Sequence, residues 1–167
     1  MKRYIVVAIL ILLGFGFFFY TQTRSVRESI SLATMADTFG YSEENHIAIN
    51  NTCLSTLQSN TDCQITLTYF TDLTLDDIEQ IASNEAFQAR EPQSISQDFF
   101  DQLDPQREML EVSFVDNTIN GYMFPPKTIQ SITYQISFIP STENTQLTQT
   151  NTGNTKNIIH IVATSQR

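Results

Sequence analysis

The chain opens with an uninterrupted apolar run. Residues Tyr4 to Tyr20 carry no charge, and these 17 residues are mostly Ile, Val, Leu and Phe. A helix needs roughly 20 apolar residues to cross a bilayer core about 30 Å thick. Two cations precede the run, which favours a cytoplasmic N-terminus, and the two tyrosines suit the membrane interfaces. The pattern predicts a transmembrane anchor over residues 1–23 and an extracytoplasmic domain over residues 24–167.

The same run is open to a second interpretation, a cleaved signal peptide. Its apolar segment would be Ile5–Leu13, followed by the small residues Gly14 and Gly16. Cleavage after Gly16 would leave an exposed aromatic cluster starting at Phe17, so the uncleaved anchor is the preferred interpretation. Both alternatives place the domain outside the cytoplasm. The short basic start is typical of a bacterial inner-membrane protein with its domain in the periplasm.

Beyond the anchor, apolar residues recur at helical spacing in three places. The first helix is expected over Ser25–Phe39, with Gly40 as its C-terminal stop. No Pro or Gly interrupts residues 17–38, so this helix is expected to continue the membrane span. Thr74 and Ser96 are the expected N-caps of two further short helices.

The second half of the domain alternates apolar and polar residues, as antiparallel strands do. Residues 140–156 lack apolar periodicity and are expected to form a hairpin loop. The predicted architecture is an α+β domain: a transmembrane helix continuing into an amphipathic helix, then short helices packed on an antiparallel sheet of about four strands. The expected strands are Gln64–Phe70, Glu108–Asp116, Thr128–Ile139 and Asn157–Thr164.

A helix that leaves the membrane and a sheet of about four antiparallel strands together resemble pilins and pseudopilins at the level of architecture. The resemblance implies a component of a secretion or pilus-like assembly. The leader of type IV prepilins is not present, because Gly14 and Gly16 lie late in the run and no Glu occurs in it.

Charge narrows the range of partners. Lys2 and Arg3 precede the anchor, so the remaining seven Lys and Arg face all eighteen Asp and Glu, a net charge of −11. Thirteen of these acids lie within residues 62–116, beside two arginines. Such a surface repels nucleic acid and anionic membrane. The sequence therefore predicts a solvated acidic surface, or a patch for a basic partner or a cation.

Cys53 and Cys63 are the two cysteines of the chain. In an oxidising compartment, such a pair most simply forms one structural disulfide. A metal site would need further Cys or His nearby, and a redox-active pair more often has two intervening residues. The disulfide is therefore the prediction.

The sequence offers little catalytic chemistry. His46 follows two glutamates, which allows a carboxylate-rich metal site or a solvated turn, and His160 alternates with isoleucines, so it is expected to face solvent or a cross-strand neighbour. The acids at residues 72–79 suit a helix N-terminus, and those at residues 98–104 an exposed helix face. No nucleophile elbow or Gly-rich phosphate loop occurs. We expect no enzymatic activity, no cofactor and no metal.

Tyr122, Met123 and Phe124 precede a double proline and form the best candidate surface for a partner, or else fold over the sheet as part of the core. The sequence thus predicts a non-catalytic, membrane-anchored envelope protein whose exported domain binds protein partners. The alternative is a tethered or secreted ligand-binding or sensory domain for a small molecule or a cation.

Overall fold

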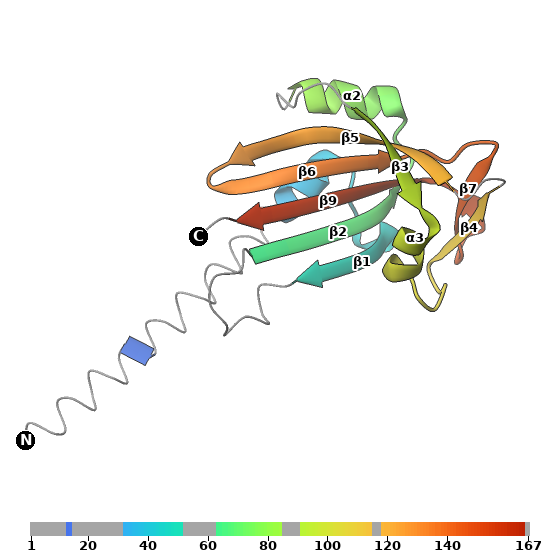
Figure 1. Cartoon of the computed structure of the whole chain (residues 1–167), viewed down its shortest axis with the longest axis horizontal. Helices are drawn as coiled ribbons and strands as arrows, with labels where there is room; N and C mark the ends of the chain where they lie inside the picture. Colours follow the sequence, from blue (N-terminus) through green and yellow to red (C-terminus); the bar gives the residue numbers. More distant parts are fainter. Residues whose placement is uncertain (1–12, 15–31, 52–62, 85–90, 115–117, 166–167) are drawn as a thin grey trace, which may run out of the picture.

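The structure, a computed structural model, describes residues 13–14, 32–51, 63–84, 91–114 and 118–165. Within them the chain forms nine strands in two sheets, and every pairing is antiparallel (Figure 1). The larger sheet has the order β1 (His46–Asn51), β2 (Cys63–Thr71), β9 (Asn157–Ser165), β6 (Ile132–Ile139), β5 (Thr118–Ile129) and β3 (Glu91–Ser96). The smaller sheet has the order β4 (Leu110–Phe114), β7 (Thr145–Gln149) and β8 (Asn154–Thr155).

Helices are a minor part of this fold. They comprise residues 32–38, the 3-10 turn η1 (Glu43–Asn45), α2 (Leu75–Asn84) and α3 (Gln97–Leu103). The predicted α+β domain with about four strands is therefore wrong, because the described part of the chain is mostly antiparallel β structure. The resemblance to pilins, which rested on that four-stranded layout, loses its basis with it.

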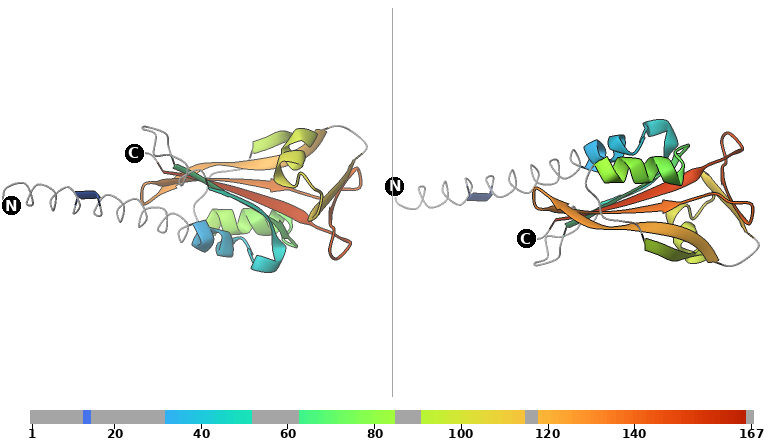
Figure 2. Two further views of the ribbon diagram at one scale, coloured as in Figure 1. Left: turned by 90° about the horizontal axis from the view of Figure 1, so that it is seen from below. Right: turned by 90° about the horizontal axis from the view of Figure 1, so that it is seen from above.

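The main core lies on the face of the larger sheet that carries the segment 32–38 and α2 (Figure 2). Strict alternation in β2, β6 and β9 directs every second side chain into it, as predicted from the sequence. Large side chains that are almost fully buried fill the space between the layers. The central strands contribute Ile65, Leu67 and Tyr69, then Ile132, Tyr134, Ile136 and Phe138, and finally Ile159, Ile161 and Ala163.

A second, smaller core lies on the opposite face of the same sheet, at one end. There α3 and the smaller sheet pack over the strands (Figures 1 and 2). Its buried members are Ile47, Phe70, Ile95, Phe100, Leu110, Ile139, Leu147 and Ile158. The larger sheet is therefore covered along one face and only partly covered on the other.

The segment 32–38 ends as the sequence predicts. Gly40 has φ +77°, a backbone conformation that L side chains rarely adopt. The Gly40 N–H donates to the carbonyl of Asp37 at 3.1 Å, and the Tyr41 N–H donates to that of Ala36 at 3.0 Å. These two bonds form a Schellman motif, which satisfies carbonyls that the end of a helix would otherwise leave unpaired.

The N-cap of α2 is also confirmed. The hydroxyl of Thr74 accepts the Asp77 N–H at 3.3 Å, and the Asp77 carboxylate accepts the Thr74 N–H at 2.8 Å. This reciprocal pair is a capping box. The hydrogen bonds from Thr74 lower the pKa of the exposed Asp77 carboxyl below its ordinary value. The acids at this helix start have a structural role.

Five of the nine described strands, β1, β3, β5, β7 and β8, are not among the four strands expected from the sequence. β5 contains Gly121 and the double proline Pro125–Pro126, and β3 contains Pro92. The prolines of β5 fit because the pairing with β6 shifts register between Phe124 and Lys127, as at a β-bulge. β7 and β8 fall in the polar stretch that was expected to be a loop.

The anticipated anchor lies almost entirely outside the described residues. Only Leu13 and Gly14 of the run are described, and both are helical and exposed. Among the described residues, no helix is both long and apolar enough to span a bilayer.

Candidate functional site

One half of the second face of the larger sheet is not covered by any described element. Register places two rows of side chains there: Asn50, Thr66, Val162 and Gln135 in the first, and Gln64, Thr164, Thr133 and Thr128 in the second. We call these eight residues the polar face. Seven of them are polar and one, Val162, is apolar; none is charged, and each is exposed or half-buried. Strands lie about 4.8 Å apart, so a face that runs from β1 to β5 is roughly 20 Å wide.

His160 stands at the boundary between the polar face and the second core. Its cross-strand neighbours are Thr68 on β2 and Ser137 on β6. The Thr68 hydroxyl and the His160 Nδ1 are 2.8 Å apart and hydrogen-bonded. The ring of Phe99, from α3, meets the imidazole edge to face at 5.2 Å. His160 therefore contacts a cross-strand neighbour, one of the two outcomes expected from the sequence.

Burial lowers the pKa of His160 to about 4. The imidazole is therefore neutral at physiological pH and adds no charge to this end of the polar face. Beside it on β6, the Gln135 Nε2 donates to the Met123 sulfur at 2.7 Å. The Thr128 and Thr133 hydroxyls hydrogen-bond to each other at 2.9 Å. The polar face is therefore a neutral surface made mostly of amide and hydroxyl side chains.

The polar face ends at an edge strand, β1. Its side chains are His46, Ile47, Ala48, Ile49, Asn50 and Asn51, with no Asp, Glu, Lys, Arg or Pro among them. Apart from Leu13, Ile49 is the one exposed large apolar residue that the structure describes, with 57 % of its surface accessible. The register shift of β1 lies between His46 and Ala48, and the residues from Ala48 onward pair regularly with β2.

The other described strand edges each carry a feature that discourages further pairing. β3 has the exposed Glu91 and Pro92, and β4 has the exposed Glu111. β8 is only two residues long. β1 is thus the least protected edge in the described part of the molecule.

Carboxylates gather at the start of β1. Glu43 and Glu44 of η1 are exposed and directly precede the strand, and Asp37 is exposed in the helical segment nearby. Burial raises the pKa of the Tyr41 hydroxyl, and the charges of Glu43 and Asp37 raise it further. The negative charges at this end of the edge therefore act on the neighbouring side chain of Tyr41.

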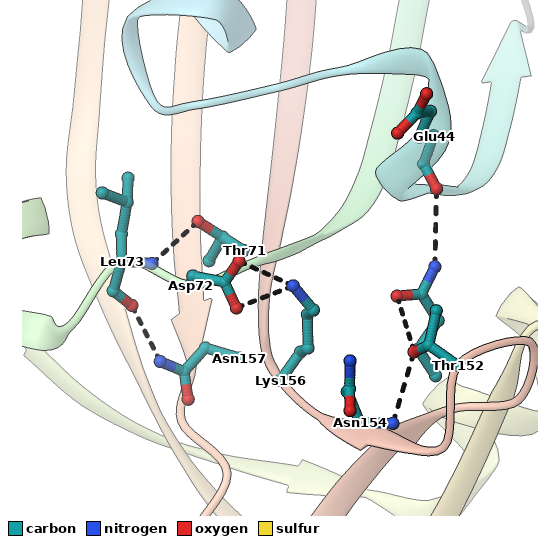
Figure 3. A network of polar contacts seen from close by, with 9 residues as sticks. Glu44, Thr71, Asp72, Leu73, Thr152, Asn154, Lys156 and Asn157 are labelled. Carbon is teal, nitrogen blue, oxygen red and sulfur yellow. Dashed lines mark hydrogen bonds and ion pairs between the residues drawn. The ribbon is translucent and has the colours of Figure 1, made fainter.

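Polar contacts join the turn after β2 to Lys156 and to Asn157 at the start of β9, and join η1 to β7 of the smaller sheet (Figure 3). Lys156 Nζ bonds both carboxylate oxygens of Asp72, at 2.7 and 2.6 Å. Asn157 Nδ2 donates to the Leu73 carbonyl at 2.7 Å, and Gln149 Nε2 donates to the Glu44 carbonyl at 3.4 Å. Asp72, whose acidic neighbourhood had suggested cation binding, is thus paired with a lysine.

The partner surface anticipated from the sequence does not form as one exposed patch. Tyr122 and Phe124 point into the main core, where Phe124 is only 2 % exposed. Met123 lies half-buried on the opposite face, next to Gln135. The reason is that these residues form part of β5, in which successive side chains alternate between faces. Burial of Phe124 agrees with the alternative that was left open, a place in the core.

The remaining candidates are scattered. Cys63 begins β2, but Cys53 lies outside the described residues, so the disulfide stays a prediction. His46 begins β1, and its Nε2 is buried without a hydrogen-bond partner. Asp104, expected on an exposed helix face, is instead buried. The described residues contain no group of three or more His, Cys, Asp or Glu that could hold a metal ion.

The polar face was not predicted from the sequence. Its only local signal is a run of uncharged polar residues at alternate positions of β2 (Gln64, Thr66 and Thr68) and of β6 (Thr133, Gln135 and Ser137). Each strand alone looks like the solvated side of a sheet. Only the register shows that these positions form one continuous neutral surface.

Comparisons with protein families, with curated proteins and with solved structures find no match to this chain. No activity, ligand or partner is therefore carried over from a relative. The features of the described residues that bear on function are the polar face and the edge strand that borders it.

Proposed function

We propose that this protein is a non-catalytic, membrane-tethered envelope protein whose exported β domain binds a protein partner through the polar face. One observation carries the proposal, the absence of charge on all eight residues of that face in a domain whose net charge is −11. The tether is proposed from the apolar run of residues 4–20, and the periplasmic location from the cations before it.

The neutrality of the face suits protein docking for a physical reason. A partner that covers charged side chains must strip them of water, which costs several kcal/mol per unpaired ion. Threonine, asparagine and glutamine side chains can instead exchange water for hydrogen bonds to a partner at little net cost. The half-buried state of most of these side chains adds to this, because they have less conformational entropy left to lose.

A solvated sheet face is the competing explanation, since antiparallel sheets often present one side to water. A surface designed for solubility carries about 25–35 % charged residues with both signs mixed. Eight such positions would then hold about two or three charges. The polar face holds none, although Asp, Glu, Lys and Arg make up 16 % of the chain.

The test is photocrosslinking of the full chain in its native membrane. A photoreactive phenylalanine at Thr133, on the polar face, is expected to give an adduct with a protein. The same group at Gln80, exposed on α2 on the other side of the sheet, serves as the control. The adduct should disappear when Thr164→Lys introduces a charge into the face.

Two outcomes would contradict the proposal. The first is equal crosslinking from Thr133 and Gln80, which would mean that the face has no preference for a partner. The second is an absence of protein adducts together with a small ligand that raises the melting temperature of the full chain. That result would favour the ligand-binding alternative.

A further inference from the structure

We infer that β1 takes up an extended segment of a protein partner as an additional strand, and that this segment alternates apolar residues and carries Lys or Arg at the end beside Glu43 and Glu44. The inference rests on the proposed function and deepens it, because it names the strand that docks and the chemistry of the segment. It follows from the edge, from Ile49 and from the charges at the start of the strand.

The edge of β1 provides the backbone for pairing. Alternate N–H and C=O groups of an edge strand point away from the sheet, where another strand can bond to them. Pairing from Ala48 onward is regular on the β2 side, so the strand is straight enough to serve as a template. The edges of β3, β4 and β8 are each protected by a charge, a proline or extreme shortness.

Ile49 provides the apolar contact. Its side chain projects from the strand with 57 % of its surface accessible, on the same face as its cross-strand neighbour Leu67. An added strand would place a side chain directly opposite Ile49, about 4.5–5.5 Å away between Cβ atoms. Since side chains in a strand alternate between faces, every second residue of the segment lies on the same face as Ile49. These are the positions at which apolar residues are expected.

The charges at the start of β1 determine which end of the segment should be basic. Glu43 and Glu44 are exposed there, and Asp37 adds to their potential. A basic residue next to them gains attraction, whereas an acidic one is repelled. In an antiparallel arrangement, the slightly more stable one, the C-terminal end of the segment lies beside these acids. Basic residues are therefore expected at that end.

The same charges argue against a second copy of this chain as the occupant. The exported part has a net charge of −11, so two copies repel each other at low ionic strength. The polar face meets β1 through Asn50, so a partner that adds a strand can also contact the neutral surface. A basic segment of a different protein is attracted to the acidic start of β1, and that protein can also contact the polar face.

The test uses the full chain in a neutral detergent and a synthetic peptide as the probe. The peptide has four Thr-Val repeats followed by two lysines, with blocked ends and a fluorescent label. Binding is measured by anisotropy at low salt and again at 0.5 M salt. We expect saturable binding that weakens at least tenfold in the Ile49→Lys variant and is weakened by salt.

The matched control is Ser94→Lys, which adds the same charge at an exposed position on the opposite edge, β3. It should bind the peptide as the unmodified chain does. Changing Glu43→Gln together with Glu44→Gln should weaken binding of the lysine peptide several-fold. The same double variant should leave binding of a lysine-free peptide of Thr-Val repeats unchanged.

Three results would overturn the inference. One is unchanged affinity in Ile49→Lys, and another is equal binding of a peptide whose alternate backbone nitrogens are methylated, since such a peptide cannot pair as a strand. The third is a dimer of the full chain that Ile49→Lys dissociates, which would make a second copy the occupant. If Thr133 crosslinks to a protein in membranes while β1 binds no peptide, the inference fails and the proposed function stands.

Discussion

Asp104 lies just after α3, and its carboxylate accepts three backbone N–H groups. Glu108, Met109 and Leu110 donate them at 3.1, 2.6 and 2.6 Å. Asp104→Asn should lower the free energy of unfolding by about 2–3 kcal/mol, because an amide nitrogen cannot accept these bonds. Denaturant unfolding of the full chain in neutral detergent, followed by circular dichroism, measures the change.

The control for this change lies one turn earlier in α3. Asp101 is exposed, and it interacts only at the surface, with Gln97 at 3.1 Å and with Arg107 at 3.6 Å. Asp101→Asn should change the free energy of unfolding by less than about 0.5 kcal/mol. Equal effects of the two substitutions would mean that the loop after α3 does not depend on the Asp104 carboxylate.

His160 should make stability depend on pH. Burial lowers its pKa to about 4 in the folded chain, against an ordinary value near 6.5 when unfolded. Below pH 6.5 the unfolded chain binds a proton that the folded chain does not, so stability falls as the pH falls. From pH 7 to pH 5 the loss is about 2 kcal/mol.

The contribution of His160 is isolated by comparison with His160→Gln, which cannot titrate. Melting temperatures of the full chain and of this variant are measured between pH 7 and pH 5. All other groups are the same in both proteins, so their contributions cancel in the difference. A variant with the same pH dependence as the unmodified chain would contradict the assignment to His160.

At the scale of elements, Tyr69 attaches the helical segment 32–38 to β2. Its hydroxyl donates to the carbonyls of Ala36 and Phe39 at 3.3 and 3.2 Å, and burial raises its pKa far above the ordinary value. Tyr69→Phe should cost about 1–2 kcal/mol of unfolding free energy, because it leaves buried carbonyls at the helix end without this donor.

The comparison for this element is Tyr41→Phe. The rings of Tyr41 and Tyr69 meet edge to face at 5.2 Å, and a phenylalanine at either position keeps that contact. Tyr41→Phe is therefore expected to cost less than Tyr69→Phe by at least about 1 kcal/mol. If the two costs are equal, the hydroxyl of Tyr69 does not hold the helix end.

The elements that could be predicted are those whose local pattern agrees with their surroundings. β2, β6 and β9 alternate strictly, and the ends of two helices carry Gly40 and Thr74 in their expected roles. β5 was missed because Gly121 and two prolines indicate a turn, whereas a β-bulge accommodates the prolines in the folded sheet. Tertiary pairing overrides local preference there.

β7 shows a second reason why some elements could not be predicted from the sequence. Its buried side chains are Thr145, Leu147 and Gln149, so only one of the three is apolar and no hydrophobic period is visible. The polar ones are buried because hydrogen bonds satisfy them, as in the bond from Gln149 to the Glu44 carbonyl. The polar face escaped prediction for a related reason, because it depends on the register of five strands.

At the scale of the whole molecule, the proposed tether would hold the polar face and the acidic surface near a membrane. Anionic lipid headgroups repel a domain with a net charge of −11, so the domain is not expected to lie flat on the membrane that holds it. A partner in the same compartment can then reach the polar face and β1.

The last prediction concerns the proposed tether. The full chain should remain in the membrane pellet after a carbonate wash, because the proposed anchor over residues 4–20 would place its apolar side chains in the lipid core. A chain that lacks residues 1–23 should be released by the same wash. Protease added to spheroplasts should digest the domain, while protease added to intact cells should not. A mature protein that starts at Phe17 would instead mean cleavage after Gly16, and the domain would then have to find its partner by diffusion.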